Sequence, residues 1–60
     1  MKIKCPVCEK GIITEPFDAC PVCGWLDDPF QEEAPDEGGG NNKMSLNEAR
    51  KAWKEGRKIE

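Results

Sequence analysis

The same four-residue unit, Cys-Pro-Val-Cys, occurs twice in the first 23 residues of this chain. We call Cys5-Pro6-Val7-Cys8 the first knuckle and Cys20-Pro21-Val22-Cys23 the second knuckle, and together they contain all four cysteines. A CxxC turn places two sulfurs on one side of a tight loop, so two such turns supply the four ligands of a tetrahedral metal ion. The proline after the first sulfur of each unit fixes φ at about −65°, which lowers the entropy lost when metal binds. We therefore predict a metal site formed by Cys5, Cys8, Cys20 and Cys23.

The segment between the knuckles indicates how they are brought together. Eleven residues separate Cys8 from Cys20, fewer than the roughly 15 to 20 of common zinc-ribbon patterns. They still allow two strands of about four residues and a short turn, and the β-prone run Gly11-Ile12-Ile13-Thr14 lies among them. We expect a β-hairpin between the knuckles. Gly24, after the second knuckle, can adopt a positive φ that turns backbone N–H groups toward the sulfurs.

The rest of the chain is too small to form a stable apolar core by itself. Of its 60 residues 37% are hydrophobic, and the aromatic residues are Phe17, Trp25, Phe30 and Trp53. A domain of this size buries only about 60% of the surface that its unfolded chain exposes. We predict a single domain, residues 1–60, in which the metal stabilises the fold and Trp25 and Trp53 are core residues. A chain of this length has no room for a substrate cleft and its scaffold.

The cysteine content indicates a reducing compartment. At about 7% it lies below the roughly 8 to 10% that marks a disulfide scaffold, and no apolar signal segment follows Met1-Lys2-Ile3-Lys4. An apolar run of about 18 residues is also absent, so we expect no membrane insertion. We predict a cytoplasmic protein whose cysteines hold metal rather than form disulfides. A thioredoxin-type exchange centre is disfavoured because it requires a βαβ unit.

The chain after the knuckle and hairpin region (residues 1–26) changes in composition. Residues 27–44 form a glycine-rich segment whose first part, 27–40, carries six acidic residues and no basic one. The acidic residues are Asp27, Asp28, Glu32, Glu33, Asp36 and Glu37. We expect an exposed loop in which these carboxylates are solvated.

Residues 45–56 have the pattern of a helix. Ser45 and Glu48 fit a capping box, and Gly56 fits a C-terminal stop. Leu46, Ala49 and Trp53 recur on one face, which should pack against the cysteine-bearing half. The predicted fold class is therefore a small metal-organised α+β fold, with a rubredoxin-like or zinc-ribbon β-hairpin, two CPxC knuckles and one C-terminal α-helix.

The four thiolates also limit the chemistry of the site. We predict one zinc ion, with iron as the alternative, because CPxCG turns also hold iron in rubredoxins and tetrahedral sulfur sites suit both metals. Zinc is favoured because the sequence offers no reason for electron transfer. A catalytic zinc keeps an open coordination position, usually with three protein ligands and a water. Because this chain supplies four thiolates and no histidine, we predict that it is not an enzyme.

The charge balance bears on the kind of partner. We expect a monomeric protein-interaction or adaptor module that binds another protein. The alternative is a nucleic-acid-binding zinc ribbon that uses the basic side of the predicted helix. Binding to the phosphate backbone of nucleic acid requires a positive field. The formal net charge of this chain is −3, and four thiolates around one zinc make it more negative. Nucleic-acid binding is therefore disfavoured.

Several motifs together resemble the small bacterial cysteine-rich CPCC family. They are Cys5-Pro6-x-Cys8, the run Cys20-Pro21-Val22-Cys23-x-Trp25-x-Asp27-Asp28, Gly39-Gly40-x-Asn42, and Ser45-Leu46-x-Glu48-Ala49-Arg50. The resemblance implies a zinc-binding module and no particular reaction. The chain departs from the family's CPCCG motif, because Val7 replaces the middle cysteine and Glu9 replaces the glycine. Neither change removes a predicted ligand, but we expect a less tightly wound first turn without the glycine.

Overall fold

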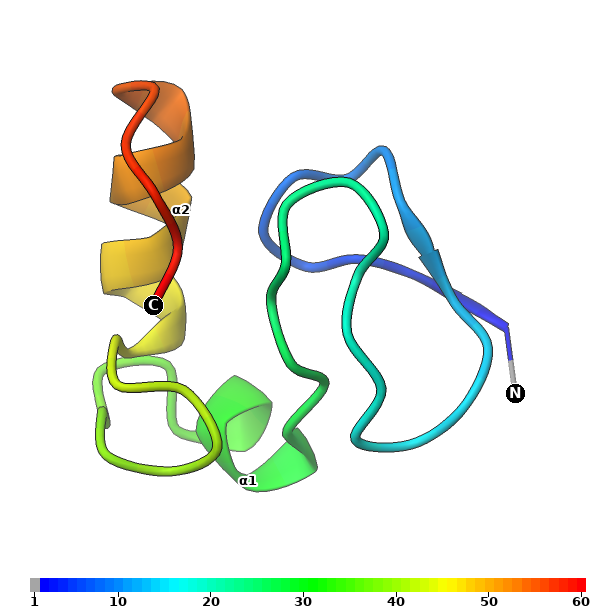
Figure 1. Ribbon diagram of the computed structural model, residues 1–60. Coiled ribbons are helices and arrows are strands. Elements are labelled where there is room, and N and C mark those ends of the chain that lie inside the picture. Colours follow the sequence, from blue (N-terminus) through cyan, green and yellow to red (C-terminus); the bar gives the residue numbers. More distant parts are fainter. Residues whose placement is uncertain (1) are drawn as a thin grey trace.

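Two short strands and two helices form the regular secondary structure of residues 2–60, the part of the chain that the computed structural model describes (Figure 1). Strand β1 (Ile3–Lys4) pairs antiparallel with β2 (Ile12–Ile13), and α1 (Pro29–Glu33) and α2 (Leu46–Lys54) follow. The molecule measures 26 × 22 × 14 Å. Helix α2 stands beside the two knuckles, and α1 lies at the end of the molecule where α2 begins (Figure 1). The fold is thus a small α+β structure with a two-stranded antiparallel hairpin.

The prediction of a β-hairpin between the two knuckles is wrong. The two paired strands lie instead on either side of the first knuckle. Ile3 lies opposite Ile13, so β1 and β2 are the two arms of a turn that contains Cys5 and Cys8. The second knuckle has its own pair of arms, joined by a single bridge between Ala19 and Leu26. The physical reason lies after β2, where Pro16 lacks an N–H and Phe17 has φ 63°. Neither residue continues an extended strand, so β2 pairs with the chain that the first turn brings alongside.

The expectation that the acidic segment lacks regular structure is also wrong, because it contains α1. The Asp28 side chain caps this helix: its Oδ1 accepts hydrogen bonds from the backbone N–H groups of Phe30 (3.0 Å) and Gln31 (3.3 Å). Pro29 occupies the first helical position, where its missing N–H costs nothing. The Asp28-Pro29 pair therefore marks the start of a helix. It was missed in the sequence analysis because the composition of the surrounding segment favours a loop.

A buried amide pair, Gln31 and Asn42, holds the glycine-rich part of the segment in place. Gln31 Nε2 donates to the carbonyl oxygens of Glu37, Asn42 and Met44 at 3.0 to 3.2 Å. Its Oε1 accepts from the backbone and side-chain amides of Asn42. Asn42 also exchanges two hydrogen bonds with the backbone of Leu26. Because both side chains are buried, their polar atoms replace the apolar contacts that this segment lacks.

Two of the acidic residues expected to be solvated are buried instead. Asp27 is 2% exposed and Asp28 is 5% exposed. Asp27 Oδ2 accepts from the N–H of Phe17 at 3.3 Å, whereas its Oδ1 has no hydrogen-bond partner among residues 2–60. Half-buried Glu32 accepts from Trp25 Nε1 (3.2 Å) and the Asp28 N–H (3.1 Å). Burial raises the pKa of Glu32, and the neighbouring Asp27 carboxyl acts in the same direction.

Helix α2 begins as the sequence predicts. The Ser45 side chain accepts from the Glu48 N–H (3.1 Å), and the Glu48 carboxylate accepts from the Ser45 N–H (2.9 Å). The helix buries Leu46, Ala49 and Ala52, and Gly56 follows its end with φ 74°. The last residues then run back along α2, so that the Met44 N–H donates to the Glu60 carbonyl at 3.0 Å. Neither helix of residues 2–60 has the length and apolar character needed to cross a membrane.

The core residues occupy a single cluster between the knuckles and α2. Trp25 is fully buried, which confirms its prediction as a core residue. Trp53 is half-buried and packs against the edge of the cluster. Few of the buried hydrophobic residues are large, because cysteine and alanine account for five of the nine. The apolar part of the core is correspondingly thin.

We predict that Glu32→Gln makes stability less dependent on pH. A carboxyl whose pKa is raised by folding stabilises the protein below its unfolded-state pKa of about 4.5 and loses this contribution as pH rises through the folded value. Glutamine stays neutral and can donate to the neighbouring Asp27 carboxyl. The free energy of unfolding of the variant, relative to the parent, should therefore increase above about pH 4.5. Urea unfolding over a pH series measures this difference, with exposed Glu33→Gln on the same helix as control. A difference that is flat with pH would contradict the prediction.

Candidate metal centre

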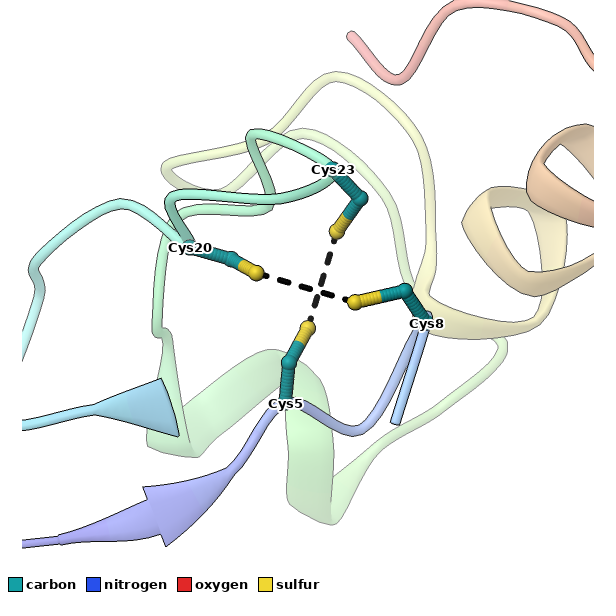
Figure 2. A group of neighbouring side chains, drawn as sticks. All are labelled: Cys5, Cys8, Cys20 and Cys23. Atoms are coloured by element: carbon teal, nitrogen blue, oxygen red, sulfur yellow. Dashed lines mark hydrogen bonds between the residues drawn. The ribbon is translucent and has the colours of Figure 1, made fainter. Parts of the chain in front are cut away.

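The four cysteine side chains converge on one point (Figure 2). Their Sγ atoms all lie within 4.8 Å of one another. Cys5 Sγ lies 3.6 Å from Cys23 Sγ, and Cys8 Sγ lies 3.7 Å from Cys20 Sγ. A tetrahedral zinc ion with bonds of about 2.3 Å to sulfur requires sulfurs about 3.8 Å apart. These contacts fit that geometry, and they are far longer than the roughly 2.05 Å of a disulfide.

Both close contacts join one knuckle to the other. Each knuckle therefore supplies two corners of the tetrahedron, and neither can complete it alone. Cys5, Cys8 and Cys20 are at most 5% exposed, while Cys23 is half-buried. The structure thus brings together all four cysteines that the sequence singles out, as free thiols. Their arrangement is that of a possible metal site, and metal ligation by them stays a prediction.

The two knuckles share the same backbone turn. The N–H of Glu9 donates to the Cys5 carbonyl at 3.0 Å, and the N–H of Gly24 donates to the Cys20 carbonyl at the same distance. Both donors have positive φ, 59° for Glu9 and 88° for Gly24. The positive φ expected at Gly24 is confirmed. The expectation that the first knuckle is less tightly wound than the second is wrong, because both knuckles have the same hydrogen bond at the same distance. Glu9 adopts the left-handed conformation, which costs a residue with a Cβ about 1 to 2 kcal/mol.

Backbone N–H groups surround the sulfurs, as expected for a cluster of thiolates. Val7 donates to Cys5 Sγ and Val22 donates to Cys20 Sγ, both at 3.4 Å. Cys8 Sγ accepts from Lys10 and Gly11, both at 3.5 Å. These amides offset part of the negative charge that four thiolates and a divalent cation would leave at the cluster.

The thiol pKa values show that the site lacks positive charge of its own. Burial disfavours the Cys8 thiolate, but hydrogen bonds from the N–H groups of Gly11 and Lys10 and from the Cys20 and Cys23 thiols together outweigh this effect and lower its pKa to about 7. Burial raises the pKa of Cys5 and of Cys23, and the nearby Cys5 sulfur raises that of Cys23 further. The protein alone thus favours the Cys8 thiolate and disfavours the thiolates of Cys5 and Cys23. A divalent cation at the centre supplies the charge that would deprotonate the whole set.

Gly11 is a residue of the centre that our sequence analysis assigned only to a β-prone run. A Cβ at this position would overlap Cys20 Sγ and approach Val22 Cγ2 to 3.3 Å. The backbone of Gly11 therefore forms one wall of the four-sulfur cluster, where no side chain fits. A glycine inside a strand-like pattern often marks a close approach of this kind, so the sequence did contain a signal for it.

The fold and the cluster define a class of small protein in which paired cysteine turns form one four-sulfur centre. The model of the Cysteine-rich CPCC family matches residues 3–56 of the chain. The match covers both knuckles, the acidic segment and α2, so the chain belongs to this family. A comparison with curated proteins finds no match.

We predict that Glu9→Gly stabilises the protein. Glycine takes positive φ without the steric cost of a Cβ, although it gains entropy in the unfolded chain. The variant also loses the exposed ion pair between Lys4 and Glu9, whose atoms lie 3.9 Å apart and which contributes little. The free energy of unfolding should rise by about 0.5 to 1 kcal/mol, measured by urea unfolding at constant metal concentration.

Gly24→Glu is the matched control for this change, because it gives the second knuckle the residue of the first. A Cβ at Gly24 would meet no atom within 4 Å, so the positive φ is the main cost of the change and the variant should be destabilised by a similar amount. Equal stability of Glu9→Gly and the parent would contradict the strain at Glu9.

We predict that Gly11→Ala weakens metal binding. The added methyl must displace Cys20 Sγ. Overpacking of this kind costs about 1 to 3 kcal/mol, or about fivefold to 150-fold in affinity. Chelator competition measures the affinity, and the visible spectrum of the Co²⁺-substituted protein reports distortion of the tetrahedron. Gly39→Ala, at a positive φ with open space around it, is the control for backbone strain alone. An unchanged Co²⁺ spectrum in Gly11→Ala would contradict the prediction.

Proposed function

We propose that this protein is a small zinc-binding protein in which a structural four-cysteine site organises a surface for another protein. The observation that carries the metal assignment is the spacing of the sulfurs, with opposite contacts of 3.6 and 3.7 Å between the two knuckles. Membership of the Cysteine-rich CPCC family supports a metal-binding role for the cysteines. The chain would bind one ion and act as a monomer.

A structural role for the metal follows from the thin apolar core. The buried hydrophobic residues larger than cysteine or alanine are Val7, Ile13, Trp25 and Leu46. Binding of zinc to small finger peptides contributes about 10 to 16 kcal/mol at neutral pH, more than the net stability of a typical small domain. The same four ligands fill every position of a tetrahedral ion, which argues against catalysis at the metal. We therefore propose no enzymatic activity.

We prefer zinc to iron because nothing in the sequence indicates electron transfer. Tetrahedral sulfur suits both ions, and the sulfur spacing does not distinguish them. An electron-transfer role needs a redox partner surface, and the chain offers no feature that indicates one. Iron electron transfer is therefore the alternative that the test below must address.

We prefer a protein partner to nucleic acid because the surface exposes aromatic side chains and the chain has a negative net charge. Phe30 is 77% exposed and Phe17 is 53% exposed, so half of the aromatic residues contribute little to the core. Large exposed aromatic side chains are enriched where proteins meet other proteins. The formal net charge of −3, made more negative by metal-bound thiolates, opposes binding to a backbone polyanion.

We predict that metal removal unfolds the protein. Chelation should abolish the near-UV circular dichroism of buried Trp25, and added Zn²⁺ should restore it, because the folded state depends on the site. Native mass spectrometry of protein purified without added metal identifies the ion, and the visible spectrum separates colourless zinc from coloured iron. Added Mg²⁺ is the control, since a hard cation prefers oxygen ligands and should restore nothing.

Three results would contradict parts of this proposal. A native fold that persists after complete chelation would remove the structural role of the metal. A coloured iron adduct would replace zinc with iron. A metal-free mass lacking four hydrogens would mean that the cysteines form disulfides.

A further inference from the structure

We propose that a groove between the first knuckle and α2 binds a short acidic peptide segment of the partner protein. This inference rests on the proposed function, because it names the surface and the chemistry of the protein partner. It depends on a cavity, on three cationic side chains without acidic partners, and on an arginine held in place by the first knuckle.

The groove has a volume of about 500 Å³, within the range of ligand-binding pockets. One wall is the first knuckle, with Val7 and Cys8. The other wall is the second half of α2, where Arg50, Lys51 and Lys54 accompany Trp53. Arg50 precedes Trp53 by three positions and Lys54 by four, and Lys51 precedes Lys54 by three, so neighbouring members share one side of the helix.

Apart from the Cys8 ligand, the side chains that line the groove carry a net positive charge, with three cations and one carboxylate. Within residues 2–60, Arg50, Lys51 and Lys54 form no ion pair with a carboxylate. The one acidic residue of the lining is Glu9, and its carboxylate already lies 3.9 Å from Lys4 Nζ. Carboxylates of a partner would therefore meet three available cations, which gives electrostatic complementarity and steers association.

The first knuckle fixes the direction of one of these cations. Arg50 Nε donates to the Pro6 carbonyl at 2.8 Å. Its two terminal NH₂ groups remain available for a carboxylate, and a guanidinium that is already oriented loses less entropy on binding. Because Pro6 lies between two cysteines of the centre, the position of Arg50 depends on the fold of the first knuckle.

Trp53 adds an apolar contact between the charges. It is half-buried at the edge of the core, so part of the indole faces the groove. A partner with an apolar side chain between acidic ones would cover the indole while its carboxylates reach Lys51 and Lys54. An acidic peptide that also contains leucine has this chemistry.

A peptide fits better than nucleic acid or a second copy of the chain. Nucleic-acid binding relies on many phosphate contacts, and this groove offers three cations on a protein of net charge −3. The acidic segment lies at the other end of the molecule, around α1 (Figure 1). Pairing of that end with the groove of a second copy would be head to tail and would build rings or open chains. Such assemblies are a distinct and measurable outcome.

The test measures binding of the zinc-loaded full-length protein to short synthetic peptides of glutamate and leucine that carry a fluorescent label. Matched peptides with glutamine in place of glutamate, and single-stranded RNA of the same net charge, are the comparison probes. Anisotropy gives the affinity and its dependence on salt. We expect binding of the glutamate peptide, about tenfold weaker or absent binding of the glutamine peptide, and quenching or a shift of Trp emission that Trp53→Phe removes.

Paired charge-removing variants locate the site. Lys51→Gln with Lys54→Gln removes two charges from the groove, and Lys2→Gln with Lys58→Gln removes two from exposed positions outside the groove. The groove variant should bind about tenfold more weakly, and the control should bind like the parent. Phe30→Ser tests the exposed aromatic residue on α1 and should leave binding unchanged. Zinc content and the near-UV spectrum of each variant show separately that the metal centre and the fold are intact.

The outcomes separate the inference from the proposed function. A zinc-loaded, folded protein that binds no acidic peptide overturns the inference alone, and so does equal loss of binding in both double variants. Tighter binding of RNA than of the acidic peptide assigns the groove to nucleic acid. A mass that increases with protein concentration, and that the groove variant returns to the monomer value, assigns it to a second copy. Failure to bind zinc at all removes the proposed function first.

Discussion

The contact between four sulfurs is the constraint on which the rest of the structure depends. Each close pair joins one knuckle to the other, so the two chain reversals meet at the thiols. The other parts of the core are placed by this contact: Gly11 lies against Cys20 without room for a side chain, and Leu46 and Ala49 of α2 complete the same cluster. A metal ion at this point would replace the apolar burial that a chain of 60 residues lacks.

A second, polar centre positions α2 relative to the knuckles. Gln31 and Asn42 connect the end of the second knuckle, through Leu26, to the start of α2, through the Met44 carbonyl. Buried amides succeed here because nearly all of their donors and acceptors are used, which removes the penalty for burying them. This network explains how a segment rich in glycine and acid takes a defined shape, and it sets α2 at the distance from the first knuckle that leaves a groove between them.

Local signals in the sequence predicted local structure well. The capping box of Ser45 and Glu48 and the glycine stop at Gly56 mark α2, because each requires only residues a few positions apart. The repeated CxxC unit likewise predicts the set of four sulfurs. The Asp28-Pro29 helix start was missed because its signal is short and the surrounding composition favours a loop. Burial of Asp27 and the pairing of β1 with β2 were missed because both depend on contacts formed only in the folded chain.

The sequence by itself determined which four cysteines form the sulfur cluster and where α2 starts and ends. It also determined that the chain belongs to the Cysteine-rich CPCC family. These follow from residue identity and short spacing, which are independent of how distant segments pack. Only the tertiary structure decided that each knuckle has its own hairpin arms, that Glu9 takes the left-handed turn of its glycine counterpart, and that Arg50 meets the Pro6 carbonyl. The physical reason is that such contacts join residues far apart in the chain, or require strain that the surrounding structure imposes.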